Sequence, residues 1–182
     1  MMFFAHDLGD GYSLALRTSD SADELLELIQ KNLSRLRQWE QWALAEQTIE
    51  QLRAHIAERL QLFIAGTSIP CNIYAGDQLI GNIELRINSY NSIAEIGYWI
   101  DEDFEGRGVV TRACRALIEH GTKIGVRRFE LYTAAHNERS GAVARRLGFA
   151  HEGVLRASTP LGDQRFDSNV YGMVVDHATG IS

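Results

Sequence analysis

The sequence predicts a single α/β domain with a mixed, mostly antiparallel sheet of about seven strands and about four helices. Two patterns predict it. Apolar residues recur at helical spacing between residues 20 and 64, and alternate as in strands between residues 71 and 100. A helical stretch then separates two strand-like segments, which indicates one strand–helix–strand crossover. A chain of 182 residues can bury one core, so we expect residues 1–182 to form one domain.

The first third of the chain is predicted to hold one strand and two helices. The strand covers Tyr12–Arg17. The apolar stripe of the next helix consists of Leu25, Leu26, Leu28, Ile29 and Leu33. A polar and aromatic segment, Arg35–Trp42, precedes a second helix over roughly Thr48–Ile64. Arg35 and Arg37 are expected on a solvated face.

The middle of the chain is predicted to hold three consecutive strands and a helix. Cys71–Ala75 and Leu79–Ile87 alternate as strands, and Gly76-Asp77-Gln78 between them is typical of a hairpin turn. The third strand is Ile93–Ile100. The helix starts near Val109 and ends near Gly121 or Gly125.

The last third is predicted to hold three strands and a short helix. Arg128–Ala134 is a strand, and Arg139–Leu147 is a helix that ends at Gly148, a residue favoured just past a helix. His151–Ala157 and Arg165–Val175 are the two final strands.

Composition and charge exclude several classes of function. The net charge of −6 argues against binding nucleic acid directly, and no apolar run is long enough to span a membrane. The first residues lack the basic start of a signal peptide, so we expect a cytoplasmic protein. Cys71 and Cys114 are expected as reduced core residues, and no His/Cys spacing indicates a metal site.

Residues 104–111, Phe-Glu-Gly-Arg-Gly-Val-Val-Thr, are the most informative stretch. They join a strand to a helix, whose first amides have no partner within the helix and can bind a phosphate. Gly106 and Gly108 allow the backbone to approach a ligand closely. No Gly-Lys-Ser/Thr follows, so the turn is not a nucleotide P-loop. An ordinary strand-to-helix turn is the alternative.

Four motifs in order resemble one family. They are Gly81-Asn82-Ile83-Glu84, Ala94–Ile100, Glu105–Val110, and Asn137-Glu138-Arg139-Ser140 followed by Arg145–Phe149. Together they are similar to the GNAT superfamily of N-acetyltransferases, in the RimJ/RimL-like branch that acetylates ribosomal-protein N-termini. The resemblance covers nearly the whole chain. It implies acetyl-CoA as the cosubstrate and a sheet whose fourth and fifth strands splay apart around the pantetheine arm.

The resemblance also implies residues that bind the coenzyme. The backbone near Trp99, Ile100 and Asp101 is expected to contact pantetheine. The pyrophosphate is expected at the amides of Gly106, Arg107, Gly108, Val109, Val110 and Thr111. Asn137 matches the coenzyme-contacting asparagine after the fifth strand, and it can also cap the next helix. One of Arg145 and Arg146 is a candidate for the 3′-phosphate, and otherwise both belong to a solvated face.

Two steps of the reaction need side chains: the amine must lose a proton and the thiolate must gain one. Glu95 is the first candidate for the base and Glu84 the second. The alternative for Glu95 is a solvent-facing or ion-paired carboxylate. Ser140 is the candidate that protonates the thiolate, with a helix-capping serine as the alternative. His136 is expected at the surface.

Some positions depart from the family pattern. Glu105 replaces the usual Gln or Arg, and Val110 the usual Gly or Ala, which the branch tolerates. Thr133 and Thr159 stand where some members carry a cysteine and a glutamate. A mechanism that uses those two groups is therefore not expected here.

The sequence thus predicts an enzyme that acetylates the α-amine of a protein or peptide N-terminus. Acetylation of a small amine, such as an amino acid, polyamine or antibiotic, is the second hypothesis. A non-catalytic sensor that binds acyl-CoA is the third. Trp39 and Trp42 are candidates for the acceptor site, with core packing as the alternative. The resemblance is compatible with a homodimer.

Overall fold

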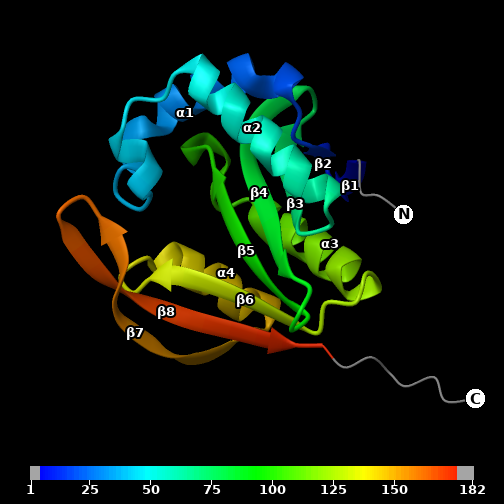
Figure 1. Ribbon diagram of the computed structural model, residues 1–182, viewed down its shortest axis with the longest axis vertical. Coiled ribbons are helices and arrows are strands. Elements are labelled where there is room, and N and C mark those ends of the chain that lie inside the picture. The colour runs from blue at the N-terminus through cyan, green and yellow to red at the C-terminus, as the bar shows by residue number, and fades with distance from the viewer. Residues whose placement is uncertain (1–4, 176–182) are drawn as a thin grey trace, which may run out of the picture.

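A single eight-stranded sheet runs through the computed structural model, which describes residues 5–175 (Figure 1). The strands lie in the order β1-β2-β3-β4-β5-β6-β8-β7. Their bounds are β1 Ala5–Gly9, β2 Tyr12–Leu16, β3 Ser68–Ala75, β4 Gln78–Asn88, β5 Ile93–Ile100, β6 Arg128–Ala134, β7 Ala150–Leu161 and β8 Gln164–Val174. The β5–β6 pair is parallel and the other pairs are antiparallel.

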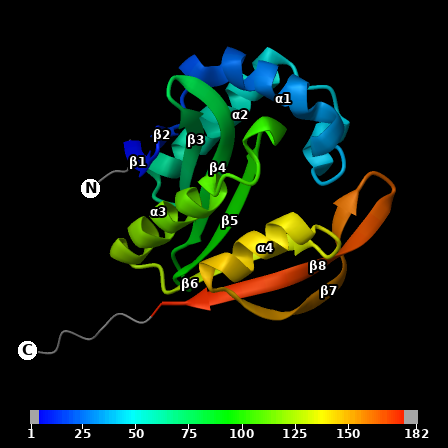
Figure 2. The same ribbon diagram turned by 180° about the vertical axis from the view of Figure 1, so that it is seen from behind.

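Four helices cover the sheet on both faces, as Figures 1 and 2 show from opposite sides. Helices α1 (Ala22–Leu36) and α2 (Ile49–Ile64) lie on one face, and α3 (Val109–Lys123) and α4 (Glu138–Leu147) on the other. The side chains of α1 and α2 form one core with Leu79 of β4. The larger core lies on the face covered by α3. These two cores fix the sheet between two helical layers.

Local sequence explains where the helices begin and end. Thr48 accepts a hydrogen bond from the Gln51 amide at 3.3 Å, and the Gln51 side chain accepts one from the Thr48 amide at 3.1 Å. This reciprocal capping box starts α2. Asn137 caps α4 through the Ser140 amide at 3.1 Å, and Gly148 ends that helix with φ 89°.

Strands β5 and β6 separate after a short paired stretch. They pair only through Ile93–Glu95 of β5 and Arg128–Glu130 of β6. Beyond that stretch, residues 96–100 of β5 have β4 on one edge and no partner strand within residues 5–175 on the other. The fourth and fifth of the expected strands therefore splay apart, as predicted.

Two strands differ most from the sequence prediction, and β3 begins at Ser68, three residues before the predicted Cys71. β1 was not predicted, because among its residues only Leu8 is buried and no alternation results. β7 continues to Leu161, past the predicted end at Ala157, although most of its side chains are exposed. Both strands are held by backbone pairing at an edge of the sheet, which hydrophobic patterning does not report.

Cys71 and Cys114 are buried free thiols, as predicted. Across residues 5–175, no helix is both long enough and apolar enough to cross a membrane.

Candidate functional site

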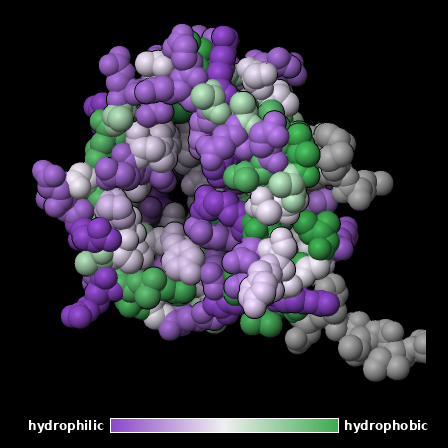
Figure 3. Space-filling view, in the orientation of Figure 1, coloured by the Kyte–Doolittle hydropathy of each residue, from purple (hydrophilic) through white to green (hydrophobic). Residues whose placement is uncertain are grey.

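The gap between the splayed strands opens into a cleft of about 1900 Å³. Its walls come from α1, β4, β5, the loop before α3, β6 and α4. Figure 3 shows the hollow between α1, β5 and β6, ringed mainly by hydrophilic residues. The cleft reaches from the turn at Gly106 on one side of the molecule to the inner face of α1 and α2 on the other. It can therefore bring together two ligands that enter from different sides.

The turn before α3 forms one end of the cleft. Gly106 and Gly108 have φ values of 73° and 75°, a conformation that favours glycine. A Cβ added at either glycine would have no atom within 4 Å, so both face open space. The first helical hydrogen bond runs from the Arg112 amide to the Gly108 carbonyl at 3.1 Å, which leaves the amides of residues 109–111 without helical partners. This arrangement fits the pyrophosphate of a coenzyme.

Several arginines place positive charge near this turn. Arg107 lines the cleft, as does Arg146, which donates a hydrogen bond to Thr111 Oγ1 at 3.1 Å. Arg112 instead forms an ion pair with Asp10 at 2.5 Å and is not part of the cleft lining. Of the pair Arg145 and Arg146, only Arg146 lines the cleft.

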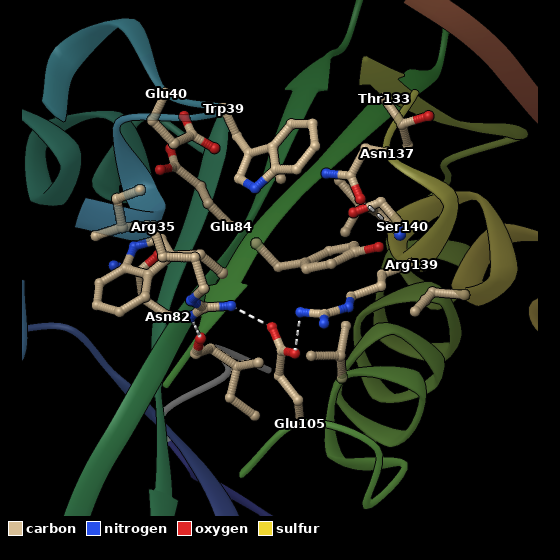
Figure 4. A pocket seen from close by; sticks show the side chains of 18 of the residues that line it. Arg35, Trp39, Glu40, Asn82, Glu84, Glu105, Thr133, Asn137, Arg139 and Ser140 are labelled. Carbon is tan, nitrogen blue, oxygen red and sulfur yellow. Dashed lines mark hydrogen bonds and ion pairs between the residues drawn. The ribbon is translucent and has the colours of Figure 1, made fainter. Parts of the chain in front are cut away.

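Glu105 ties three parts of the molecule together (Figure 4). Its carboxylate accepts hydrogen bonds from Arg35 of α1 and from Arg139 of α4, the latter at 2.5 Å. Arg35 also donates to the Ile100 carbonyl of β5. The expectation of a solvated Arg35 is therefore wrong: its guanidinium is drawn inward by an acceptor on β5 and a carboxylate in the loop.

The three residues expected beside pantetheine differ in position. Trp99 and Ile100 line the cleft, at the edge of β5 that no described strand pairs. Asp101 does not line it. Its amide donates to the Ile80 carbonyl at 2.7 Å, and its buried carboxylate binds Lys31 at 2.7 Å. Asp101 thus fixes the end of β5 against α1 and β4, and its backbone amide is unavailable to a ligand.

Three hydroxyl groups gather on the α4 side of the cleft. Ser140 lies in the first turn of α4, and the Tyr98 hydroxyl is close to it. The Tyr98 and Thr133 hydroxyls are buried and have no hydrogen-bond partner of good geometry among residues 5–175. Burial raises the pKa of Tyr98, so its hydroxyl stays protonated. Protonated hydroxyls here can donate hydrogen bonds to a sulfur or oxygen atom of a ligand.

The two predicted base candidates lie on the α1–α2 side of the sheet, and both have partners. Glu95 forms an ion pair with Arg86 at 2.5 Å across the β4–β5 pair. Glu84 is buried and accepts hydrogen bonds from Ser68 at 2.7 Å and Arg59 at 3.4 Å. Of the two, Glu95 is the more accessible from the cleft.

Glu40 is a further carboxylate of the cleft, above Glu84 in Figure 4. It is half-buried, accepts a hydrogen bond from the Trp42 indole at 2.9 Å, and forms no ion pair within residues 5–175. Burial raises the pKa of this carboxyl, an effect that the nearby Arg86 opposes. An unpaired carboxylate facing a cleft can bind a ligand's ammonium group or accept its proton.

The segment that follows α1 contributes several side chains to the lining of the cleft. Trp39 stacks on His136, which in turn contacts Phe166 of β8, with ring centroids 5.1 and 5.0 Å apart. The Gln41 side chain accepts a hydrogen bond from the Gly162 amide at 2.7 Å. Trp39 and Trp42 both line the cleft, so this segment is a wall of the candidate site.

Sequence reasoning missed Tyr98, Glu40 and Arg17 as site residues. Tyr98 stands in an alternating strand, where an aromatic residue indicates core packing. Glu40 and Arg17 lie at a turn and at a strand end, where charge is ordinary. What marks these side chains is the polar partners that they lack after folding, and a sequence does not show which partners a side chain will have. No group of three or more His, Cys, Asp or Glu side chains within the described residues is arranged to hold a metal ion.

Comparisons with known proteins agree with this geometry. A model of the acetyltransferase (GNAT) domain matches residues 13–150. The ribosomal-protein-serine acetyltransferase of Escherichia coli (strain K12) is 37% identical over 154 residues, covering 84% of this chain and 86% of that relative. The putative ribosomal N-acetyltransferase YdaF of Bacillus subtilis (strain 168) is 30% identical, covering 94% of this chain and 95% of that relative.

Two solved structures extend the comparison. A ribosomal L7/L12 α-N-protein acetyltransferase in complex with coenzyme A has a TM-score of 0.90 at 28% identity, covering 94% of this chain and 98% of that one. A microcin C7 self-immunity acetyltransferase in complex with acetyl-CoA and AMP has a TM-score of 0.88 at 28% identity, covering 92% and 94%. These relatives favour an enzyme over a non-catalytic sensor.

Proposed function

The chain belongs to the GNAT family of acetyltransferases and uses acetyl-CoA, and on that premise we propose that it acetylates the α-amino group of a protein or peptide N-terminus. The observation that carries the proposal is the size and course of the cleft. At about 1900 Å³ it exceeds the roughly 300–1,000 Å³ of ordinary ligand pockets. Such a cleft has room for a coenzyme arm and an extended peptide together.

The turn at residues 106–111 is our proposed coenzyme site. The free amides at the start of α3 hold the pyrophosphate, with Arg107 and Arg146 supplying positive charge beside it. The unpaired edge of β5 at Trp99 and Ile100 accepts the pantetheine arm as an added strand. The bound coenzyme supplies an acetyl group activated as a thioester.

We propose that Ser140 donates a proton to the leaving sulfur. The Tyr98 hydroxyl lies beside Ser140 and is the second donor next to that sulfur. Both hydroxyls lie on the α4 side of the cleft, and the Ser140 amide is already held by Asn137. The Ser140 side chain is therefore oriented by the first turn of α4 while its hydroxyl remains able to donate. Asn137 acts in this arrangement by capping the helix, and its amide nitrogen is left to contact the coenzyme.

Glu95 is our proposed base, reached from the α1–α2 side. An α-amino group has a pKa of about 7.7–8.0, so part of it is neutral near pH 7 and a modest base suffices. Exchanging Glu95 for Gln is expected to lower turnover more at low pH than at high pH, where the amine is neutral without help. A loss that does not vary with pH would remove Glu95 as the base and direct attention to Glu40.

A small-molecule amine is the second candidate acceptor. The observation in its favour is the likeness to the microcin C7 self-immunity acetyltransferase, whose structure is a complex with acetyl-CoA and the small molecule AMP, at the same 28% identity as the ribosomal-protein enzyme. The two candidates share the coenzyme site and differ only in what the α1–α2 side of the cleft accepts.

Acetyl transfer followed by intact-mass measurement tests the proposal. The protein and acetyl-CoA are offered peptides with varied N-termini beside amino acids, polyamines and aminoglycosides. We expect a mass gain of one acetyl group on peptide α-amines, and none on the same peptides with a blocked N-terminus. Transfer to small amines alone would overturn the peptide proposal. The Gly108→Trp variant, with its coenzyme turn blocked, measures the background.

A further inference from the structure

Arg17 lies at the inner end of the cleft, directly after β2. Its amide donates to the Pro70 carbonyl at 2.9 Å, which fixes the backbone beside β3. Its side chain is only 4% exposed, and what surface remains lines the cleft next to His55 and Arg59 of α2. A permanent charge is thus held in an almost fully buried place that still opens toward a ligand.

The Arg17 guanidinium has no partner among residues 5–175. It takes part in no ion pair or side-chain hydrogen bond there, and its Nε is a buried donor without an acceptor. Glu84 is the main source of electrostatic attraction on the Arg17 guanidinium. Glu84 is already bound by Ser68 at 2.7 Å and by Arg59 at 3.4 Å. Arg59 also pairs with the exposed Glu58 at 2.7 Å, so in the described part of the chain Glu84 is the one buried carboxylate that attracts both guanidinium groups.

This imbalance has a physical consequence. Burial opposes the charge on Arg17 and lowers the pKa of the guanidinium, but arginine does not lose its proton in proteins. His55 does not change this charge imbalance, because burial and the two neighbouring arginines lower the pKa of its imidazole and favour the neutral ring. A buried cation without a full partner is stabilised by an anion that arrives with a ligand.

An anion bound at Arg17 would belong to the acceptor and not to the pyrophosphate of the coenzyme, because the two places lie apart in the cleft. The proposed pyrophosphate site is at the start of α3, whereas Arg17 lies among α2 side chains on the opposite face of the sheet. A planar guanidinium can donate two parallel hydrogen bonds to a carboxylate, which gives an acceptor's carboxylate a defined orientation.

We propose that Arg17 is an anion-binding subsite for the acceptor, which makes the enzyme prefer amines that carry a carboxylate near the amine to be acetylated. The inference deepens the proposed function and rests on it for the nature of the acceptor. In a peptide, the carboxylate is an acidic side chain among the first residues. In a free amino acid, it is the α-carboxylate. Arg17 binds and positions the acceptor and takes no part in proton transfer.

Matched acceptors test the subsite. Peptides that differ only by Glu or Gln at one of the positions after the N-terminal residue are compared by kcat/KM, and amino acids are compared with their amides. We expect a preference for the carboxylate of on the order of tenfold, carried by KM, in the unaltered protein. In Arg17→Gln the preference disappears, and the Glu and Gln peptides have equal kcat/KM. An unaltered protein without the preference, or a preference that Arg17→Gln retains, overturns the subsite.

Controls separate a binding role from a structural one. Arg53→Gln removes an exposed α2 arginine, paired with Asp23 at 3.0 Å outside the cleft, and is expected to keep the full preference. Where Arg17→Gln fails to fold, as judged by coenzyme binding, Arg17→Lys keeps the charge without the fork geometry and is expected to reduce the preference. An undiminished preference in Arg17→Lys counts against the subsite.

The same assay keeps the two proposals apart. Peptides acetylated equally with Glu or Gln would leave the proposed function standing and overturn the subsite. Acetylation of free acidic amino acids alone, with a preference that Arg17→Gln abolishes, would overturn the peptide acceptor and support the subsite.

Discussion

The Tyr98 hydroxyl is buried beside Ser140 and has no well-aligned hydrogen-bond partner in the described part of the chain. Removing it in Tyr98→Phe costs at most a poorly aligned contact with Ser140, so we expect the melting temperature to be unchanged or slightly raised. Because we place this hydroxyl next to the leaving sulfur, kcat is expected to fall on the order of tenfold or more. Steady-state kinetics and thermal unfolding measure the two effects.

Tyr90→Phe is the matched control for that experiment. Tyr90 is 98% exposed in the turn between β4 and β5, so the same loss of a hydroxyl is expected to change neither quantity. If kcat of Tyr98→Phe equals that of the unaltered protein, the hydroxyl has no part in the reaction and Ser140 acts without it.

Glu40 gives a pH-dependent prediction at the same scale. Burial raises the pKa of its carboxyl above the ordinary value of 4.5, so the fold favours the protonated form. That contribution to stability is present below the unfolded pKa and is lost as the pH rises through the folded pKa. Glu40→Gln is therefore expected to melt higher than the unaltered protein at neutral pH and to lose this advantage in acid.

Thermal unfolding across a pH series measures the difference. Glu46→Gln, in the same segment but exposed and outside the cleft lining, is expected to show no such trend. Equal melting temperatures for the Glu40 variant and the unaltered protein at every pH would contradict the burial argument.

The residues that could be predicted from sequence are those whose spacing is itself a motif. Gly106 and Gly108 lie between a strand and a helix, and Asn137 and Ser140 lie at a helix start, so local pattern locates them. Arg17 and Glu40 could not be found in this way. What distinguishes them is the lack of an ion pair after folding, and that lack depends on where Arg59, Glu84 and Trp42 come to lie.

Strands β4 and β5 approach each other closely at Gly81, a position where the sequence already indicated the family's usual glycine. A Cβ there would lie 2.5 Å from the Trp99 carbonyl oxygen and 2.9 Å from the Ile100 Cα. Both are backbone atoms that cannot turn away. Gly81→Ala is expected to push the strands apart and to destabilise the fold by about 1–3 kcal/mol. Coenzyme affinity is expected to fall as well, since Trp99 and Ile100 form the edge that receives pantetheine.

Denaturant unfolding and calorimetric titration with coenzyme A measure these two losses. Gly66→Ala is the comparison: its Cβ would meet open space, and its φ of 75° adds strain of only about 1 kcal/mol. Coenzyme affinity equal in Gly81→Ala and Gly66→Ala would show that the spacing of β4 and β5 does not shape the coenzyme site.

Among the elements, the strands that the sequence predicted best are those with one buried face and one more exposed face. β5 and β6 have the predicted bounds, because buried and partly exposed residues alternate along them. β1 and most of β7 expose both faces, so their side chains carry no such signal. Their pairing depends on the neighbouring strand and becomes visible only once the chain has folded.

Across the whole molecule, a short parallel pairing and a few side-chain bridges connect the two sides of the cleft. Residues 93–95 and 128–130 form the pairing, Glu105 links Arg35 to Arg139, and Trp39 stacks on His136. A ligand that fills the cleft adds contacts to both sides at once. Coenzyme binding is therefore expected to stabilise the entire fold.

The expected stabilisation follows from mass action. Acetyl-CoA at about 100 times its dissociation constant contributes about 2.7 kcal/mol. For a protein of this size, that raises the melting temperature by about 5–11 °C. Gly108→Trp is expected to abolish the rise, because its side chain would project into the space where the turn meets the pyrophosphate.

Gly66→Trp is the matched control for strain. Gly66 has the same φ of 75° and the same open surroundings as Gly108, but it follows α2 and is absent from the cleft lining. Both variants are expected to lower the melting temperature of the free protein to a similar extent, and only Gly108→Trp to lose the rise with acetyl-CoA. A full rise in Gly108→Trp would place the pyrophosphate elsewhere, since a bulky side chain at this turn and a phosphate bound to the amides of α3 cannot occupy the same space.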